Sequence, residues 1–103
     1  VLPDCGSICA LLSAATGKNP LYIGKPNRNM IDILSRKTGV PQTRIAAVGD
    51  RLYTDIAVAE NAGSVSVCVL TGESSVRDIE TSPIKPRYVF QSVREIGEYL
   101  DII

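Results

Sequence analysis

The stretch Ile45-Ala46-Ala47-Val48-Gly49-Asp50-Arg51-Leu52-Tyr53-Thr54-Asp55 decides how this chain is organised. Its first five residues are apolar and uncharged, which predicts a buried strand of a parallel sheet. Asp50 follows at the end of that strand, and Asp55 comes at the start of the predicted next helix. Open α/β folds bind their ligands at this edge of the sheet. The stretch therefore predicts two carboxylates at a ligand-binding edge, although aspartates in such positions are also typical helix caps.

A lysine joins these carboxylates in the predicted arrangement. Lys25 stands between a short strand predicted over 21–24 and a helix predicted over 28–37. Most lysines are simply solvated, but this one falls at the same sheet edge as Asp50, which favours a functional role. Asp50 and Asp55 suit Mg²⁺, because this cation prefers oxygen ligands and keeps much of its water.

The remaining chain predicts an α/β fold. Apolar periodicity and turn residues predict further helices over 8–15, 52–62 and 93–99, further strands over 64–70 and 88–90, and a short turn over 76–79. Strands that alternate with helices predict a three-layer, Rossmann-like parallel sheet with helices on both faces. The predicted N-caps are Ser7, Asn27, Ser75 and Ser92. The helical residues predicted to be buried are Ile8, Leu11, Leu12, Ala15, Met30, Ile31, Ile33, Leu34, Val93, Ile96 and Leu100.

Composition excludes several classes of protein. The 103 residues correspond to one small domain of zero net charge, without histidine. Basic residues are scattered, so no nucleic-acid interface is expected, and no apolar run approaches the roughly 20 residues of a membrane span. An odd count of three cysteines favours a reduced, cytoplasmic protein. Cys5 and Cys9 lie four apart and can share one helix face, but no further Cys or His lies nearby for a structural metal site.

Two motifs in order carry a resemblance to a known family. Gly24-Lys25-Pro26 and Gly49-Asp50-Arg51-Leu52-Tyr53-Thr54-Asp55 resemble the third and fourth motifs of the haloacid dehalogenase (HAD) superfamily. Leu70-Thr71-Gly72, followed by Pro86-Arg87-Tyr88-Val89, resembles its NagD-like and p-nitrophenylphosphatase-like branch. The resemblance covers nearly the whole chain from Gly6 onward, and the combination of motifs is specific where either alone would be weak.

The resemblance implies a HAD-like fold and hydrolysis of a phosphorylated small molecule through an aspartyl-phosphate. Asp50 matches the aspartate that ligates Mg²⁺, and Asp55 matches a second acid that supports the metal site. Lys25 matches the lysine that contacts both the nucleophile and the phosphoryl group. Such chemistry brings anions together, so a divalent cation and a lysine are needed to balance the charge.

The first motif of the family, an Asp-x-Asp pair that supplies nucleophile and general acid, has no counterpart here. The six aspartates are Asp4, Asp32, Asp50, Asp55, Asp78 and Asp101, and no two of them lie two positions apart. The second motif and the cap also lack counterparts. The expectation is that residues 1–103 are the C-terminal part of a hydrolase core, inactive alone, whose partner is the remaining N-terminal core and cap of the same polypeptide.

Two other readings of the same residues stay open. The first is a non-catalytic phosphate- or nucleotide-binding α/β module with a similar sheet edge. The second is a receiver-like signalling domain, which is disfavoured because no acidic pair lies near the first predicted strand. An Asp-x-Asp-Gly motif in the upstream coding sequence would favour the hydrolase over the binding module.

Overall fold

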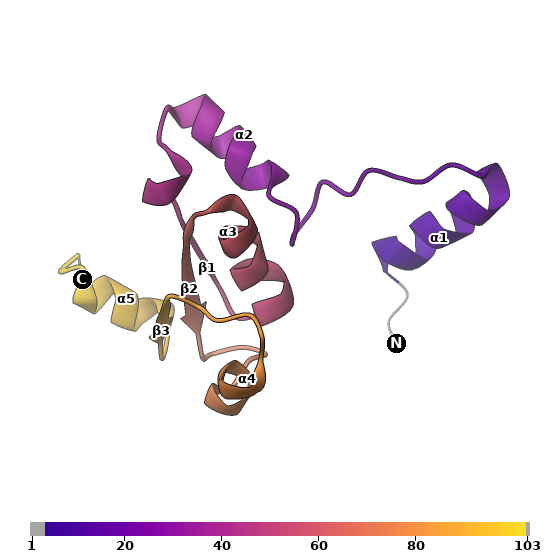
Figure 1. Cartoon of the computed structure of the whole chain (residues 1–103). Helices are drawn as coiled ribbons and strands as arrows, with labels where there is room; N and C mark the ends of the chain where they lie inside the picture. The colour runs from indigo at the N-terminus through magenta and orange to yellow at the C-terminus, as the bar shows by residue number, and fades with distance from the viewer. Residues whose placement is uncertain (1–3, 103) are drawn as a thin grey trace.

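A three-stranded parallel sheet lies at the centre of the computed structural model, which describes residues 4–102 (Figure 1). The strand order is β1 (Ala46–Gly49), β2 (Val65–Val69), β3 (Tyr88–Phe90). Gly49 pairs with Cys68, and Val69 pairs with Phe90. The helical elements are α1 (Cys5–Thr16), α2 (Asn29–Thr38), η1 (Gln42–Arg44), η2 (Leu52–Ile56), α3 (Ala57–Ala62), α4 (Val76–Thr81) and α5 (Val93–Tyr99). The predicted α/β fold class with a parallel sheet is confirmed.

The helix after the central strand forms most of the core. It begins with the π-helical turn η2 and continues as α3, which together match the helix predicted over 52–62. Ile56 and Ala59 are fully buried, and Gly63 ends α3 with a φ of 69°. Two apolar clusters result, and their buried members are Ile31, Val58 and Ala62 in one and Leu52, Ile56 and Cys68 in the other. The helix is therefore packed closely against the sheet.

The two strands nearest the core differ in burial. Residues 66–69 of β2 are buried on both faces of the sheet, as expected for a central strand with helix on both sides. Helix α5 lies on the other side of the strands from α3 (Figure 1). The prediction that β1 is buried is wrong, because Val48 remains 45% exposed. The physical reason is that β1 has a single neighbouring strand within residues 4–102.

The strand predicted over 21–24 does not form. This segment does not pair with β1, which is the edge strand of the described part of the sheet. Leu21 is accordingly 81% exposed. A strand needs a neighbour for its backbone hydrogen bonds, and β-branched or aromatic content alone does not supply one. Asn27, predicted to cap α2, instead donates its side-chain amide to the Tyr22 carbonyl at 2.9 Å.

Several helix faces that were predicted to be buried are exposed. Helix α1 buries no residue and projects away from the sheet (Figure 1). The radius of gyration is accordingly 16.0 Å, against about 13 Å for a compact chain of 100 residues. The exposed residues that correct the prediction are Ile8, Leu11, Leu12, Ala15, Met30, Ile33, Leu34, Val93 and Leu100. An apolar stripe is buried only where a second surface covers it, and none of the described elements covers these.

The predicted caps have mixed outcomes. Ser75 caps α4 in a capping box with Asp78, and Ser92 caps α5, as predicted. At α1 the cap is Asp4 rather than Ser7, and its carboxylate accepts the Gly6 N–H at 3.0 Å. In residues 4–102 no helix has both the length and the apolar character needed to cross a membrane.

The core can be tested with one substitution and a matched control. Ile56→Ala removes a side chain with no exposed surface, so it should cost about 2–5 kcal/mol in the free energy of unfolding. Ile8→Ala removes the same atoms from a site that is 62% exposed and should change stability by less than about 0.5 kcal/mol. Urea unfolding followed by circular dichroism measures both, and equal effects would contradict the assigned core.

Candidate active site

Three charged residues from separate segments meet at the carboxyl end of β1. Lys25, Asp50 and Asp55 line one open cavity of about 300 Å³, together with Arg51 and Thr54. β1 ends at Gly49, so Asp50 enters the turn that follows, and η2 then carries Asp55. Lys25 comes from the loop that precedes α2. The structure thus brings together all three residues singled out from the sequence.

Asp55 holds the lysine in place. Its Oδ1 forms an ion pair with the Lys25 ammonium, and its Oδ2 accepts the Arg51 backbone N–H at 3.2 Å. The Asp55 side chain is 12% exposed, whereas the Lys25 side chain is 44% exposed. Both carboxylate oxygens are engaged, so Asp55 orients the ammonium group toward the cavity that the two residues share.

Asp50 joins the end of β1 to the loop that follows β2. Its Oδ2 accepts the Glu73 backbone N–H at 2.7 Å, and its own carbonyl accepts the Ser74 N–H at 3.1 Å. The bond from Glu73 is the main reason that the pKa of Asp50 lies below its usual range, and the positive charges of Arg51 and Lys25 act in the same direction. Asp50 is therefore a fixed, ionised carboxylate at neutral pH.

Two glycines make this close arrangement possible. A Cβ at Gly72 would overlap the Asp50 carboxylate, and a Cβ at Gly49 would overlap the Asp55 side chain. Any larger residue would push these carboxylates away from the strand ends. The sequence analysis placed Gly72 in the Leu70-Thr71-Gly72 motif that follows a predicted strand, and it missed the contact with Asp50. The available signal was a glycine three residues after the end of β2, at the same sheet edge as Asp50.

The loop that carries Lys25 is attached to α3. Asn61 donates its side-chain amide to the Pro26 carbonyl at 2.8 Å, and Arg28 donates to the Asn61 carbonyl at 3.4 Å. Arg28 also pairs with Asp32 at 2.7 Å, which lowers the pKa of Asp32 to about 2. Asn61 is a positioning residue that sequence reasoning missed, since a single asparagine near a helix end carries no distinctive signal.

The donor set suits a hard cation only in part. Asp50 offers a charged oxygen, the ligand type that Mg²⁺ prefers, at the rim of the cavity. The Asp55 oxygens are already engaged by Lys25 and Arg51. Within residues 4–102, moreover, no group of three His, Cys, Asp or Glu residues gathers to hold a metal ion. From the described residues, Asp50 is thus the one free carboxylate of the cavity that would serve Mg²⁺ as a direct ligand.

Comparison with known families settles the relationship. The profile of the HAD-hydrolase-like family matches residues 22–96, which include Lys25 and both carboxylates. The chain belongs to this family. The ribonucleotide monophosphatase NagD of Escherichia coli K12 is 37% identical over 94 residues, which cover 91% of this chain and 38% of NagD.

Solved structures of related proteins have the same fold as this chain over the segment that it matches. A 4-nitrophenylphosphatase of Thermotoga maritima superimposes with a TM-score of 0.84 at 49% identity, over 94% of this chain and 38% of that one. A glycerol phosphate phosphatase of Mycobacterium tuberculosis, solved in complex with magnesium, gives a TM-score of 0.77 at 36% identity, over 92% and 29%. The NagD-like resemblance of the sequence is confirmed, and the chain spans less than two fifths of the length of these relatives.

The packing around Asp50 predicts a selective effect of an added methyl group. Gly72→Ala should displace the Asp50 carboxylate, cost roughly 1–3 kcal/mol in the free energy of unfolding, and return the pKa of Asp50 toward its usual value. Gly24→Ala is the control, because a Cβ there meets no atom within 4 Å; it should stay within about 0.5 kcal/mol. Urea unfolding and carboxyl NMR titration measure both effects. An unchanged Asp50 pKa in Gly72→Ala would contradict the assigned contact.

Proposed function

We propose that this chain forms part of the active site of a Mg²⁺-dependent phosphate monoester hydrolase that acts through an aspartyl-phosphate. The observation that carries the proposal is the Lys25 ammonium, held by Asp55 beside the ionised Asp50 at one cavity of the sheet edge. Membership of the HAD-hydrolase-like family and relatives named as phosphatases support it.

Lys25 has the task of binding and orienting the phosphoryl group. The Lys25 side chain is half-exposed at the cavity, while Asp55 and the Pro26–Asn61 hydrogen bond fix its position. A preorganised cation stabilises the negative charge that develops on phosphoryl oxygens during transfer. In this scheme Asp55 supports the site by holding Lys25, and the metal ligand from this chain is Asp50. When bound there, Mg²⁺ would supply Lewis-acid stabilisation of the phosphoryl group.

The nucleophile in this proposal lies outside the chain. The sequence holds no Asp-x-Asp pair, and a covalent step needs an attacking carboxylate. The remaining core of the same polypeptide would bring it, by packing on the exposed apolar surface of α1 and residues 21–23. Leu11 and Leu21 on that surface are 68% and 81% exposed. The substrate is a phosphorylated small molecule, and a cytoplasmic location stays a prediction that rests on the cysteines.

A chimera tests the activity directly. The segment of the Thermotoga 4-nitrophenylphosphatase that matches this chain is replaced by residues 1–103, and turnover of p-nitrophenyl phosphate is measured with and without Mg²⁺. Mg²⁺-dependent turnover is expected from the chimera and none from the 103-residue chain alone. A folded chimera that binds phosphate without hydrolysing the ester would favour the binding module instead.

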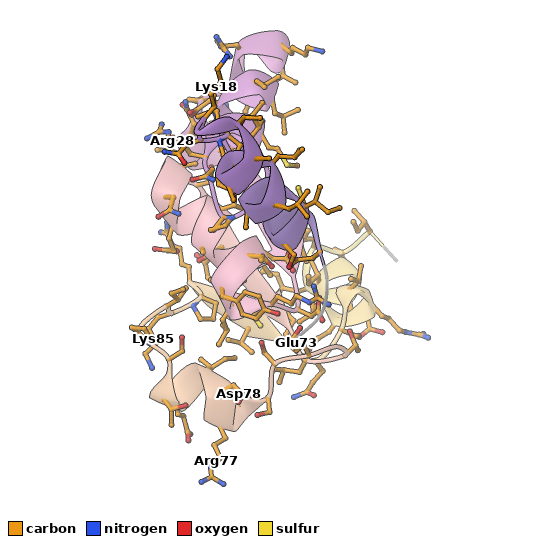
Figure 2. All side chains as sticks on the ribbon, turned by 90° about the vertical axis from the view of Figure 1, so that its right-hand side faces the viewer. Lys18, Arg28, Glu73, Arg77, Asp78 and Lys85 are labelled. Carbon is orange, nitrogen blue, oxygen red and sulfur yellow. The ribbon has the colours of Figure 1, made fainter. Side chains whose placement is uncertain are left out.

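Lys25→Met in the chimera should lower kcat by roughly a hundredfold or more, the scale of losing one preorganised electrostatic donor. Methionine keeps the apolar stem and removes the charge, so the melting temperature should change little. Lys18→Met is the matched control, because it makes the same change at a lysine outside the site. Glu73, whose backbone N–H binds Asp50, marks the site in Figure 2, and Lys18 lies well away from it. Near wild-type turnover in a folded Lys25→Met chimera would remove Lys25 from the active site.

The 103-residue chain alone should bind Mg²⁺ with an affinity in the millimolar class, because one carboxylate leaves most of the cation's water in place. Asp50→Asn should abolish this binding in a calorimetric titration, whereas Asp101→Asn, at an exposed position near the end of α5, should not. Micromolar binding would mean that the chain offers a more complete site than Asp50 alone.

A further inference from the structure

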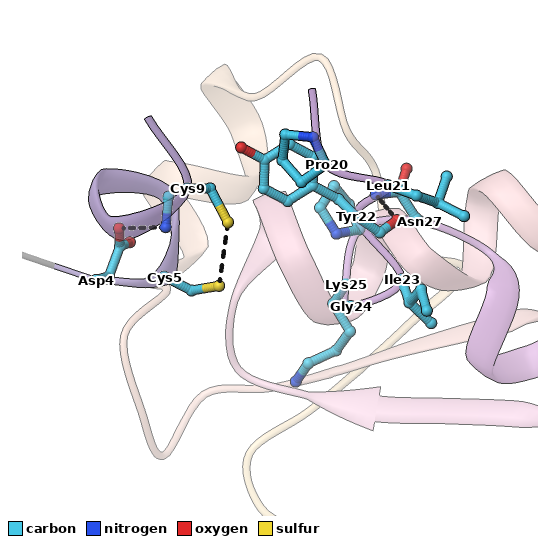
Figure 3. Close-up of a pocket in the computed structure, with 12 residues that line it drawn as sticks. Asp4, Cys5, Cys9, Pro20, Leu21, Tyr22, Ile23, Gly24, Lys25 and Asn27 are labelled. Carbon is cyan, nitrogen blue, oxygen red and sulfur yellow. Dashed lines mark hydrogen bonds between the residues drawn. The ribbon is translucent and has the colours of Figure 1, made fainter. Parts of the chain in front are cut away.

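Two thiols face each other on α1, outside the site described above. The Sγ atoms of Cys5 and Cys9 lie 3.9 Å apart, one helical turn from each other (Figure 3). Cys5 is exposed and Cys9 is half-buried, while the third cysteine, Cys68, is buried in the sheet. The pair lines a cavity of about 570 Å³ together with Tyr22 and Lys25. In the 103-residue chain both sulfurs border this cavity, so one small reagent that enters it meets the two together.

The geometry of the helix disfavours a direct disulfide between the two thiols and favours a bridge through a third atom. Residues four apart on a helix hold their Cβ atoms about 5–6 Å apart, whereas a disulfide needs about 3.5–4.5 Å. A direct S–S bond would therefore require the first turn of α1 to unwind. A single atom placed between the sulfurs avoids that change, because it forms two bonds to sulfur and spans the existing gap.

The protonation of Cys5 also favours a bridge over single-thiol chemistry. The hydrogen bond with Cys9 raises the pKa of Cys5, so at neutral pH Cys5 is a thiol rather than a reactive thiolate. Nucleophilic attack by one sulfur is thereby slowed. Bridging an atom that binds sulfur strongly removes both protons together and replaces the thiol–thiol contact by two covalent bonds.

We propose that Cys5 and Cys9 form a chelating dithiol site for trivalent arsenic. Trivalent arsenic is soft, is pyramidal, and accepts two sulfurs at a bent angle. With an organoarsenic oxide, two S–H bonds break and two As–S bonds form, and the oxygen leaves as water with both protons. Arsenic keeps its oxidation state, so no oxidant is needed. Zinc does not suit this pair. Structural zinc sites use four ligands, and no group of three His, Cys, Asp or Glu residues gathers in the described part of the chain.

Phenylarsine oxide is the probe that tests this site on the reduced 103-residue chain. Native mass spectrometry should show one arsenic per chain, and alkylation in denaturant should then label Cys68 and spare Cys5 and Cys9. Cys5→Ser and Cys9→Ser should each weaken binding by roughly a hundredfold or more, because the second bond is no longer intramolecular. Cys68→Ala should bind like the unaltered chain.

A relocated thiol tests whether the helix face matters. The double variant Cys9→Ser/Ala10→Cys keeps two nearby cysteines but places them on different faces of α1, so it should bind as weakly as the single variants. Circular dichroism confirms that each variant keeps its helix content. Binding by Cys5→Ser or by the double variant within threefold of the unaltered chain would overturn the proposal, as would protection of Cys68 from alkylation.

Discussion

The ion pair between Lys25 and Asp55 is the interaction on which the site depends. It joins two residues thirty positions apart in the sequence, one from the loop before α2 and one from the helical turn after β1. The loop is also fixed to α3 through Asn61, so the lysine has contacts on two sides. Because η2 and α3 form one continuous helix, and Ile56 of η2 packs against Cys68 of β2, core packing and the position of the charge are linked.

The elements that sequence patterns predicted well are those whose partners lie close in the chain. The helix over 52–62 connects β1 to β2 and packs on Cys68 of β2, and β3 pairs with β2, so each of these elements has its partner within the described chain. Asp50 and Asp55 were placed correctly because both follow directly from the end of β1. Lys25 was also placed correctly, although the strand expected before it does not form.

The misses in secondary structure and burial share one physical cause. The strand over 21–24 and the apolar face of α1 need a surface that residues 4–102 do not supply, so Leu21 and Leu11 stay exposed. Periodicity reports that a face is apolar, not what covers it. The roles of Gly72 and Asn61 were missed for another reason. They depend on distances between loops that are remote in sequence, and no local pattern records such distances.

The charges at the cavity give an independent argument for a cation. Lys25 is neutralised by Asp55, and Arg51 pairs with Glu73 at 2.6 Å. Among the described residues that line the cavity, Asp50 is then the carboxylate without a cationic partner. A phosphate group placed beside it would meet repulsion, since like charges at a few ångströms cost energy even near a protein surface. A divalent cation at Asp50 would turn that repulsion into attraction. The lysine alone would not do so, because Asp55 already neutralises its charge.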